Sequence, residues 1–332
     1  MIITRSASFR GLFEFLSIVL VLGAIQTSLA APSSDKSTPP PSRHPTPAAP
    51  SLETIAAAAA KKAFNGGLSG AVAGVLQVFA FMWLRTTMNY QYRYGGSMGE
   101  ALRSIYGQGG VARFYRGLGF ALVEHPLSKF GDVAANAGMV ALLTSWAPTQ
   151  DLPLFAKTLA GSVAAASWRV FLMPMDTIKT TLQVEGGQGV ALLREKVRVG
   201  GVGVLFEGAA ATLGGTFVGH YPWFVTFNTL QLLLPLADPR WPIMKLFRNA
   251  WIGLCASGVS DCCANSFRVV KTTKQTYAEP ISYLETIRMI VRQDGLRGLL
   301  GRGLLTRLLT NGLQGMVFSV VWKLLEENAF SK

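Results

Sequence analysis

The chain has 332 residues, of which 50% are hydrophobic and only 15% are charged, and its formal net charge is +13. Soluble domains carry about 25% charged residues, so this composition excludes an ordinary soluble enzyme and favours a polytopic membrane protein. Arg and Lys lie mainly at the ends of apolar stretches, a placement that suits lipid headgroups and anionic solutes better than nucleic acid.

The N-terminal region predicts a targeting sequence. Residues 1–30 have the layout of a secretory signal peptide, with an apolar stretch over Leu12–Ile25 and small residues at Ser28-Leu29-Ala30. The alternative is a first membrane helix, for which the apolar stretch is short. Residues 31–62 hold seven prolines and few acids, so we expect them to be disordered. The two segments together resemble the two-part leaders of plastid proteins.

Each third of the remaining chain predicts a long apolar helix, a short amphipathic helix and a second long apolar helix. The first long helices are expected over 64–91, 154–184 and 242–275, the short helices over 98–106, 190–198 and 282–293, and the second long helices over 115–143, 206–234 and 303–327. Most of the six long helices exceed the ~20 residues that cross a bilayer. We therefore expect six membrane spans, with both chain termini on one side.

Three copies of one pattern divide the chain. The bases Arg85, Lys179 and Lys271, each followed by two threonines, recur at offsets of 94 and 92 residues. A glycine stands 18 residues before each base (Gly67, Gly161, Gly253), and another stands 32, 29 and 32 residues after it (Gly117, Gly208, Gly303). This coincidence predicts tandem repeats at 63–145, 152–236 and 241–328.

The three cysteines, Cys255, Cys262 and Cys263, lie in one apolar stretch with no histidine nearby. Such a set is neither a disulfide framework nor a zinc site. We expect small core residues there, and no metal or cofactor in the protein. No arrangement of residues suits soluble catalysis, so we expect no enzyme activity.

Two motifs resemble signatures of the mitochondrial carrier (solute carrier) family. Pro174-Met-Asp176-Thr-Ile-Lys179-Thr-Thr-Leu-Gln183 resembles the family's Pro-x-acid-x-x-base-x-base-x-Gln at the end of an odd helix. Asp294-Gly295 followed by Arg302-Gly303 resembles its next signature. The chain is identified as a divergent member over 64–328. The resemblance implies an all-α membrane protein with six transmembrane helices in three tandem repeats with pseudo-threefold symmetry.

The resemblance also implies a gate of ion pairs at the ends of the odd helices. The expected gate residues are Arg85, Pro174, Asp176, Lys179, Gln183, Arg268, Lys271 and Gln275. Only Asp176 remains of the family's three acids, because the other two positions read Met82 and Arg268. We expect Asp176 to pair with Lys271 of the next repeat rather than with Lys179. The paired threonines either replace the missing ion pairs or suit helix packing through backbone hydrogen bonds.

The family's gate motif at the other end of the even helices is absent. The corresponding positions begin at Asn136, Phe227 and Trp322, and none gives the aromatic-acid-x-x-base pattern. Either this gate is polar and weak, or alternating access is lost.

The resemblance further implies a substrate site midway across the membrane. The expected contacts are Glu124, His125, Gly215, Thr216, His220, Arg307, Thr310 and Asn311. Independently, Glu124, His125 and Lys129 are ionisable residues inside an apolar span, where they are costly unless they face a cavity or a partner. By the same reasoning Arg169 needs an acidic or anionic partner. For His125 and His220, a helix–helix hydrogen bond and a ligand contact both remain open.

The excess of bases favours a small anionic solute. The first hypothesis is a secondary transporter that moves it across an organelle membrane by alternating access. The second is a carrier-derived scaffold or membrane insertase without transport activity. The expected partners are the solute and membrane lipids, without nucleic acid, and the protein is expected to be a monomer. The leader favours the plastid envelope, and the family favours the mitochondrial inner membrane.

Overall fold

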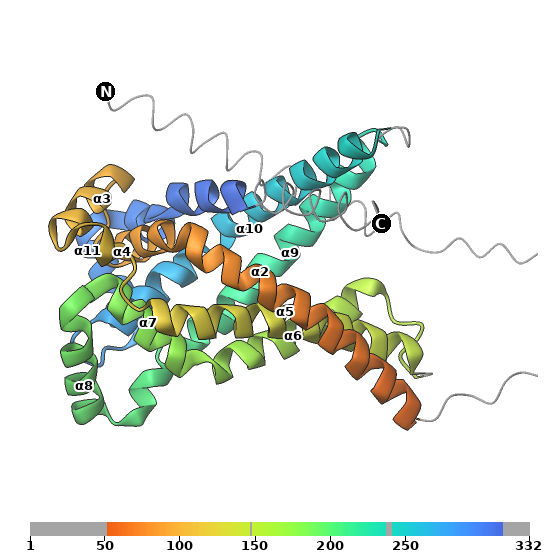
Figure 1. Cartoon of the computed structure of the whole chain (residues 1–332), viewed down its shortest axis with the longest axis horizontal. Coiled ribbons are helices and arrows are strands. Elements are labelled where there is room, and N and C mark those ends of the chain that lie inside the picture. Colours follow the sequence, from red (N-terminus) through yellow and green to blue (C-terminus); the bar gives the residue numbers. More distant parts are fainter. Residues whose placement is uncertain (1–51, 147, 237–240, 315–332) are drawn as a thin grey trace, which may run out of the picture.

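The computed structural model describes residues 52–146, 148–236 and 241–314, and the regular structure within them is helical (Figure 1). The elements are α2 (Leu52–Tyr94), α3 (Met98–Gly107), α4 (Gly110–Phe114), α5 (Leu118–Ser145), α6 (Leu154–Phe171), α7 (Met173–Glu185), η1 (Gly186–Gln188), α8 (Gly189–Gly200), η2 (Val202–Phe206), α9 (Ala209–Leu233), α10 (Pro242–Thr276) and α11 (Tyr283–Gly301). Residues 304–314 are also helical. The predicted signal peptide and the position of Trp322 lie outside the described residues.

The first helix is longer than the sequence predicted. α2 begins at Leu52, so the prediction of disorder over 31–62 is wrong for residues 52–62. The five consecutive alanines Ala56–Ala60 explain the difference, because alanine has the highest helix propensity of any residue. The proline-rich composition of the preceding residues concealed this start.

The predicted kink at Pro174 is confirmed. The first long helix of the second repeat is divided into α6 and α7 at Leu172, and Pro174 is the second residue of α7. A proline is tolerated in the first turn of a helix, where its missing N–H has no intrahelical partner to lose. The break separates the polar end of this helix, with Asp176 and Lys179, from the small-residue part that packs on α5.

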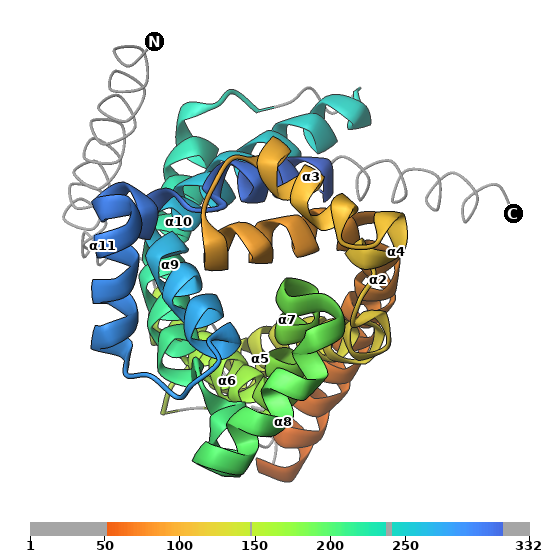
Figure 2. The ribbon, with the colours of Figure 1, turned by 90° about the vertical axis from the view of Figure 1, so that its left-hand side faces the viewer.

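The long helices surround a common axis (Figure 2), and α3, α8 and α11 lie around that axis at one end of the molecule (Figure 1). We call this the short-helix end. The three repeat glycines begin the second long helices there with positive φ: 82° at Gly117, 94° at Gly208 and 64° at Gly303. A side chain at each would meet the next repeat, at α7, α10 and α2 respectively. Only glycine suits both the backbone and the close approach, so the predicted pseudo-threefold repeat appears in the packing itself.

A buried cation from each repeat also reaches the helix end of the next. Arg113 donates to the carbonyls of Gln183 and Val184 at 2.8 and 2.7 Å, and Arg302 donates to the carbonyl of Arg93 at 3.1 Å. Such donors satisfy carbonyls that have no partner at a helix C-terminus. We call Arg113, Lys196 and Arg302 the cross-repeat cations.

Lys196 supplies the third of these links, from α8 to the end of α10. Its Nζ donates to the carbonyls of Lys274 and Gln275 at 2.8 and 3.3 Å, and to Glu207 at 2.5 Å. Burial lowers the pKa of the Lys196 ammonium, and the hydrogen bond to Glu207 opposes that lowering. The link is therefore a buried, charged contact between repeats 2 and 3.

The outer surface of the helices is apolar. Phe171, Leu232 and Phe247 are 70, 71 and 72% exposed, as expected for side chains that contact lipid. Within the described residues, Val202–Leu233 is the one stretch that is long and apolar enough to cross a membrane by length and composition. The charges of α5, at Glu124, Lys129 and Asp132, lower the mean hydropathy of that helix.

Close packing of α5 on α6 gives a stability prediction. A Cβ at Gly131 would lie 1.8 Å from Cδ1 of Trp168, whose indole N–H is fixed by the carbonyl of Leu127 at 2.8 Å. We expect Gly131→Ala to destabilise the protein by about 1–3 kcal/mol through overpacking. The check is thermal unfolding of the purified protein in detergent.

The matched control is Gly119→Ala on the same helix, where a Cβ meets nothing within 4 Å. Alanine is the better helix former, so this variant should melt at or above the wild-type temperature. Equal melting temperatures for the two variants would contradict the packing argument.

Candidate functional site

A central cavity of about 430 Å³ lies between the three repeats. All eight expected substrate contacts line it: Glu124, His125, Gly215, Thr216, His220, Arg307, Thr310 and Asn311. Six expected gate residues line it as well: Arg85, Asp176, Lys179, Gln183, Arg268 and Lys271. Pro174 and Gln275 do not. Residues far apart in the sequence are thus brought to one place, as the repeat alignment predicted.

Asp176 is the centre of the ion pairs that join repeats 2 and 3. Its carboxylate lies 2.7 Å from the Nζ of Lys271, as predicted, and 2.8 Å from the Nζ of Lys179. The prediction that Lys179 would not be a partner is wrong. Residues three apart lie on one helix face, and the acid has a second oxygen free for the local base. Gln275 donates to Asp176 at 3.2 Å and to Thr177 at 2.9 Å, which adds a neutral link between the same repeats.

Repeats 1 and 2 are joined by a second acid. Glu124 of α5 lies 2.7 Å from the Nζ of Lys179, and its side chain is only 8% exposed. Near it, the amide of Asn89 donates to Gln183 at 2.7 Å. Lys179 therefore holds one carboxylate from each of two repeats.

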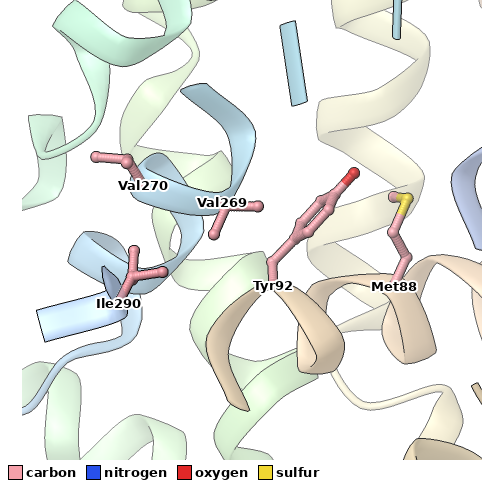
Figure 3. Close-up of a cluster of buried hydrophobic side chains, with 5 residues drawn as sticks. All are labelled: Met88, Tyr92, Val269, Val270 and Ile290. Atoms are coloured by element: carbon pink, nitrogen blue, oxygen red, sulfur yellow. The ribbon is translucent and has the colours of Figure 1, made fainter. Parts of the chain in front are cut away.

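Repeats 1 and 3 meet through apolar side chains, besides hydrogen bonds such as that of Arg302 to the carbonyl of Arg93. Met88 and Tyr92 of α2 face Val269 and Val270 of α10 and Ile290 of α11 (Figure 3). Within the described part of the chain, no ion pair joins these two repeats. The three seams between repeats are thus closed by different chemistry, although the backbone arrangement is pseudo-symmetric.

Three of the six paired threonines donate to backbone carbonyls. The hydroxyls of Thr86, Thr87 and Thr273 donate to the carbonyls of Phe114, Trp83 and Tyr92 at 2.7, 2.8 and 3.1 Å. For these three residues the packing interpretation holds, and they do not replace the missing ion pairs.

In repeat 3 an acid lies beside two arginines of the cavity wall. Asp261 is 3% exposed and accepts from Arg307 at 2.7 Å and from Arg268 at 3.0 Å. Asn311 also donates to it. This cluster holds Arg268 and Arg307 in fixed positions at the cavity.

His125 is held between neutral and cationic partners. Arg85 lies 3.0 Å from its Nδ1, and Gln77 Oε1 lies 3.2 Å from its Nε2. A guanidinium can only donate, so Nδ1 is the acceptor and the proton is on Nε2, which donates to Gln77. His125 is therefore compatible with both interpretations, a helix–helix hydrogen bond and a ligand contact, because it makes a helix–helix contact and also lines the cavity.

His220 and Arg169 also find partners across helices. The Nδ1 of His220 lies 2.6 Å from the hydroxyl of Ser162. Arg169 makes two hydrogen bonds to Asp132, at 2.8 and 2.6 Å, which confirms that Arg169 has an acidic partner. Sequence reasoning missed Asp132, although it lies eight residues after Glu124 and so on the same face of α5.

The cavity is positive. Seven bases line it (Arg85, Lys129, Arg169, Lys179, Arg268, Lys271 and Arg307), against three acids (Glu124, Asp132 and Asp176). If Asp261, which contacts two of the bases, is included, the formal net charge of these side chains is seven minus four, or +3. Arg85 and Lys129 make no ion pair with any described residue, and Nε of Arg85 is buried without a hydrogen-bond partner. A site of this kind attracts anions.

At the end of α9 that lies away from the short-helix end, the described contacts are polar. Arg248 of α10 donates to the side chain of Gln231 at 2.6 Å and to its carbonyl at 2.8 Å. The position of Trp322 lies outside the described residues. Where the family's motif would give an ion pair, Gln231 therefore accepts a hydrogen bond from the charged Arg248.

Comparison with known proteins assigns the class. The sequence profile described as "mitochondrial carrier protein" matches residues 150–237 and 244–331, more than half of the chain. The match coincides with the second and third predicted repeats. An all-helical fold in tandem repeats around a polar cavity is that of the carriers, and the chain belongs to the mitochondrial carrier family.

Curated relatives are carriers too. The chain is 27% identical over 229 residues to "calcium-binding mitochondrial carrier SAL1" of Saccharomyces cerevisiae, covering 61% of this chain and 42% of that protein. It is 28% identical over 250 residues to "calcium-dependent mitochondrial ATP-magnesium/phosphate carrier protein 2" of Arabidopsis thaliana, covering 68% and 49%. For "mitochondrial citrate transporter D" of Aspergillus niger the identity is 23% over 282 residues, covering 77% and 90%. The chain thus spans about half the length of the first two relatives.

Proposed function

We propose that this chain is a secondary transporter that moves a small anionic metabolite across an organelle membrane by alternating access. The observation that carries the proposal is the cavity, which is lined by residues of all three repeats and whose ionisable side chains have a formal net charge of +3. Two of its bases, Arg85 and Lys129, make no ion pair with a described residue, so their charges are available to an incoming anion. Two of the relatives agree with an anionic solute, since their names mention phosphate and citrate.

Alternating access requires a closure that can open. The pairs Lys271–Asp176 and Lys179–Glu124 join the repeats at the short-helix end of the cavity, at 2.7 Å each. In buried ion pairs of this kind, the attraction between the charges is roughly offset by the cost of removing them from water. They can therefore close the path without making its opening too costly in free energy. An anion bound to the cavity bases would weaken these pairs by competing for the same cations.

The test is uptake by liposomes that contain the purified full-length protein, with labelled phosphate, citrate and ATP as probes. Saturable uptake of at least one probe is expected. No uptake of any probe by a folded protein would overturn the proposal and favour a scaffold or insertase.

Lys129→Gln tests the positive potential directly. Because Lys129 makes no ion pair with a described residue, its removal leaves no described acid without a partner. We expect the half-saturation constant for the transported anion to rise about 3- to 10-fold, which corresponds to about 0.7–1.4 kcal/mol for one nearby charge at an effective dielectric constant between protein and water.

The matched control is Arg292→Gln, which removes an exposed cation of α11 outside the cavity. Its half-saturation constant should equal that of the wild type. Equal effects of the two variants would contradict a specific role for the cavity charge.

The membrane is proposed to be the mitochondrial inner membrane, from the family, or the plastid envelope, from the leader-like residues 1–62. A fluorescent fusion of residues 1–60 separates the two.

A further inference from the structure

Two acids, Asp176 and Glu124, bind the gate bases Lys179 and Lys271, and these acids differ in the number of contacts that hold them. Asp176 accepts from Lys179, Lys271 and Gln275, at 2.8, 2.7 and 3.2 Å. Among the described residues Glu124 has a single polar partner, Lys179 at 2.7 Å. Glu124 is therefore the gate acid that the fewest contacts keep in place.

Glu124 also stands where a solute would bind. It lines the cavity beside Arg85 and His125, at the depth of the other expected substrate contacts, yet it is an acid in a site whose other charges favour anions. Lys179 lines the same cavity, so an anion there can compete with this carboxylate for the ammonium group. The acid position of repeat 1 on α2 is meanwhile occupied by Met82, which is 1% exposed, so Glu124 provides the acid that repeat 1 otherwise lacks.

We propose that Glu124 is a displaceable gate carboxylate: it binds Lys179 across the seam of repeats 1 and 2 when the cavity is empty, and the anionic group of the solute replaces it. This inference rests on the proposed transport of an anion. It places ligand sensitivity at the seam of repeats 1 and 2, whereas the apolar cluster around Tyr92 at the seam of repeats 1 and 3 offers an anion no cation to compete for (Figure 3). It also makes Glu124 a competitor of the solute and not a contact for it.

The first test is the concentration dependence of uptake by Glu124→Gln in liposomes, with phosphate, citrate and ATP as probes. If Glu124 occupies Lys179 for about 90% of the time, its removal lowers the half-saturation constant about tenfold, because apparent affinity is reduced by the fraction of protein competent to bind. Glu124→Asp keeps the charge on a shorter side chain, so its half-saturation constant should lie between those of the wild type and Glu124→Gln. An unchanged or higher constant for Glu124→Gln would overturn the inference, since a plain structural role or a direct substrate contact predicts that result.

The second test does not depend on transport. Asn89 and Gln183 touch across the same seam at 2.7 Å. Both are replaced by cysteine in a full-length chain whose Cys255, Cys262 and Cys263 have been changed to alanine, and a short bis-maleimide measures their proximity. Without any anion, Glu124→Gln should lower the crosslinking yield at least threefold, and an unchanged yield overturns the inference.

The control for both tests is Glu195→Gln, which removes an exposed acid of α8 that pairs with Arg198 far from the cavity lining. It should behave as the wild type in both. If the wild type takes up none of the probes, the proposed transport fails by itself, while the crosslinking yields still decide whether Glu124 closes the seam.

Discussion

Replacement of Lys196 by methionine is expected to destabilise the protein by about 3–5 kcal/mol, the range for removing one partner of a buried ion pair. The Lys196 side chain is fully buried and donates to Glu207 and to the carbonyls of Lys274 and Gln275. Methionine fills a similar volume but donates nothing, so two carbonyls at the end of α10 lose their donor, and Glu207 keeps Lys274 alone, at 3.3 Å. Thermal unfolding in detergent should show a fall of at least about 5 °C.

The control for this prediction lies on the same helix. Arg198 pairs with Glu195 at 2.6 Å, but their side chains are 74 and 56% exposed. Arg198→Ala removes the same kind of pair from the surface, where water screens the two charges, so its melting temperature should stay close to that of the wild type. Lys196→Met melting within 1 °C of Arg198→Ala would show that the cross-repeat cation adds nothing net.

The fold was predictable from the repeat pattern because each glycine or proline of that pattern determines the backbone at its own position. A positive φ at Gly117, Gly208 and Gly303 depends on the residue itself, and the proline break at Pro174 depends on one missing N–H. Apolar periodicity then gives helices of nearly the right extent. Residues of equivalent number in the repeats meet in the cavity because the backbones are related by the pseudo-threefold axis.

Contacts that break the pseudo-symmetry could not be predicted in this way. Glu124 replaces a missing acid from a different helix, 55 residues before its partner Lys179. The cross-repeat cations occupy non-equivalent positions in their repeats, and their acceptors are backbone carbonyls, which have no signature in the sequence. Long side chains reach the same place from several backbone positions, so the repeat register does not determine which one is used.

Asp176→Asn is expected to open the gate more than any other single change. The substitution keeps the shape and the contact with Gln275, but it removes the one charge that binds both Lys179 and Lys271. Two ammonium groups then face each other with Glu124 as their remaining acid. Losing one partner of a buried pair costs about 3–5 kcal/mol, so the closed population should fall by a factor of about 10² to 4 × 10³ relative to the open one.

The measurement for Asp176→Asn is the rate at which preloaded phosphate leaves liposomes in the absence of an external anion, which should rise at least tenfold over the wild type. Asp132→Asn is the matched control: it is the same change in the same cavity, and it removes the partner of Arg169 at 2.6 Å without touching the gate bases. It should alter the half-saturation constant for uptake and leave the leak at the wild-type rate. Equal leak from the two variants would mean that any loss of cavity acid opens the path, whereas a leak confined to Asp176→Asn assigns closure to the single acid that joins Lys179 to Lys271.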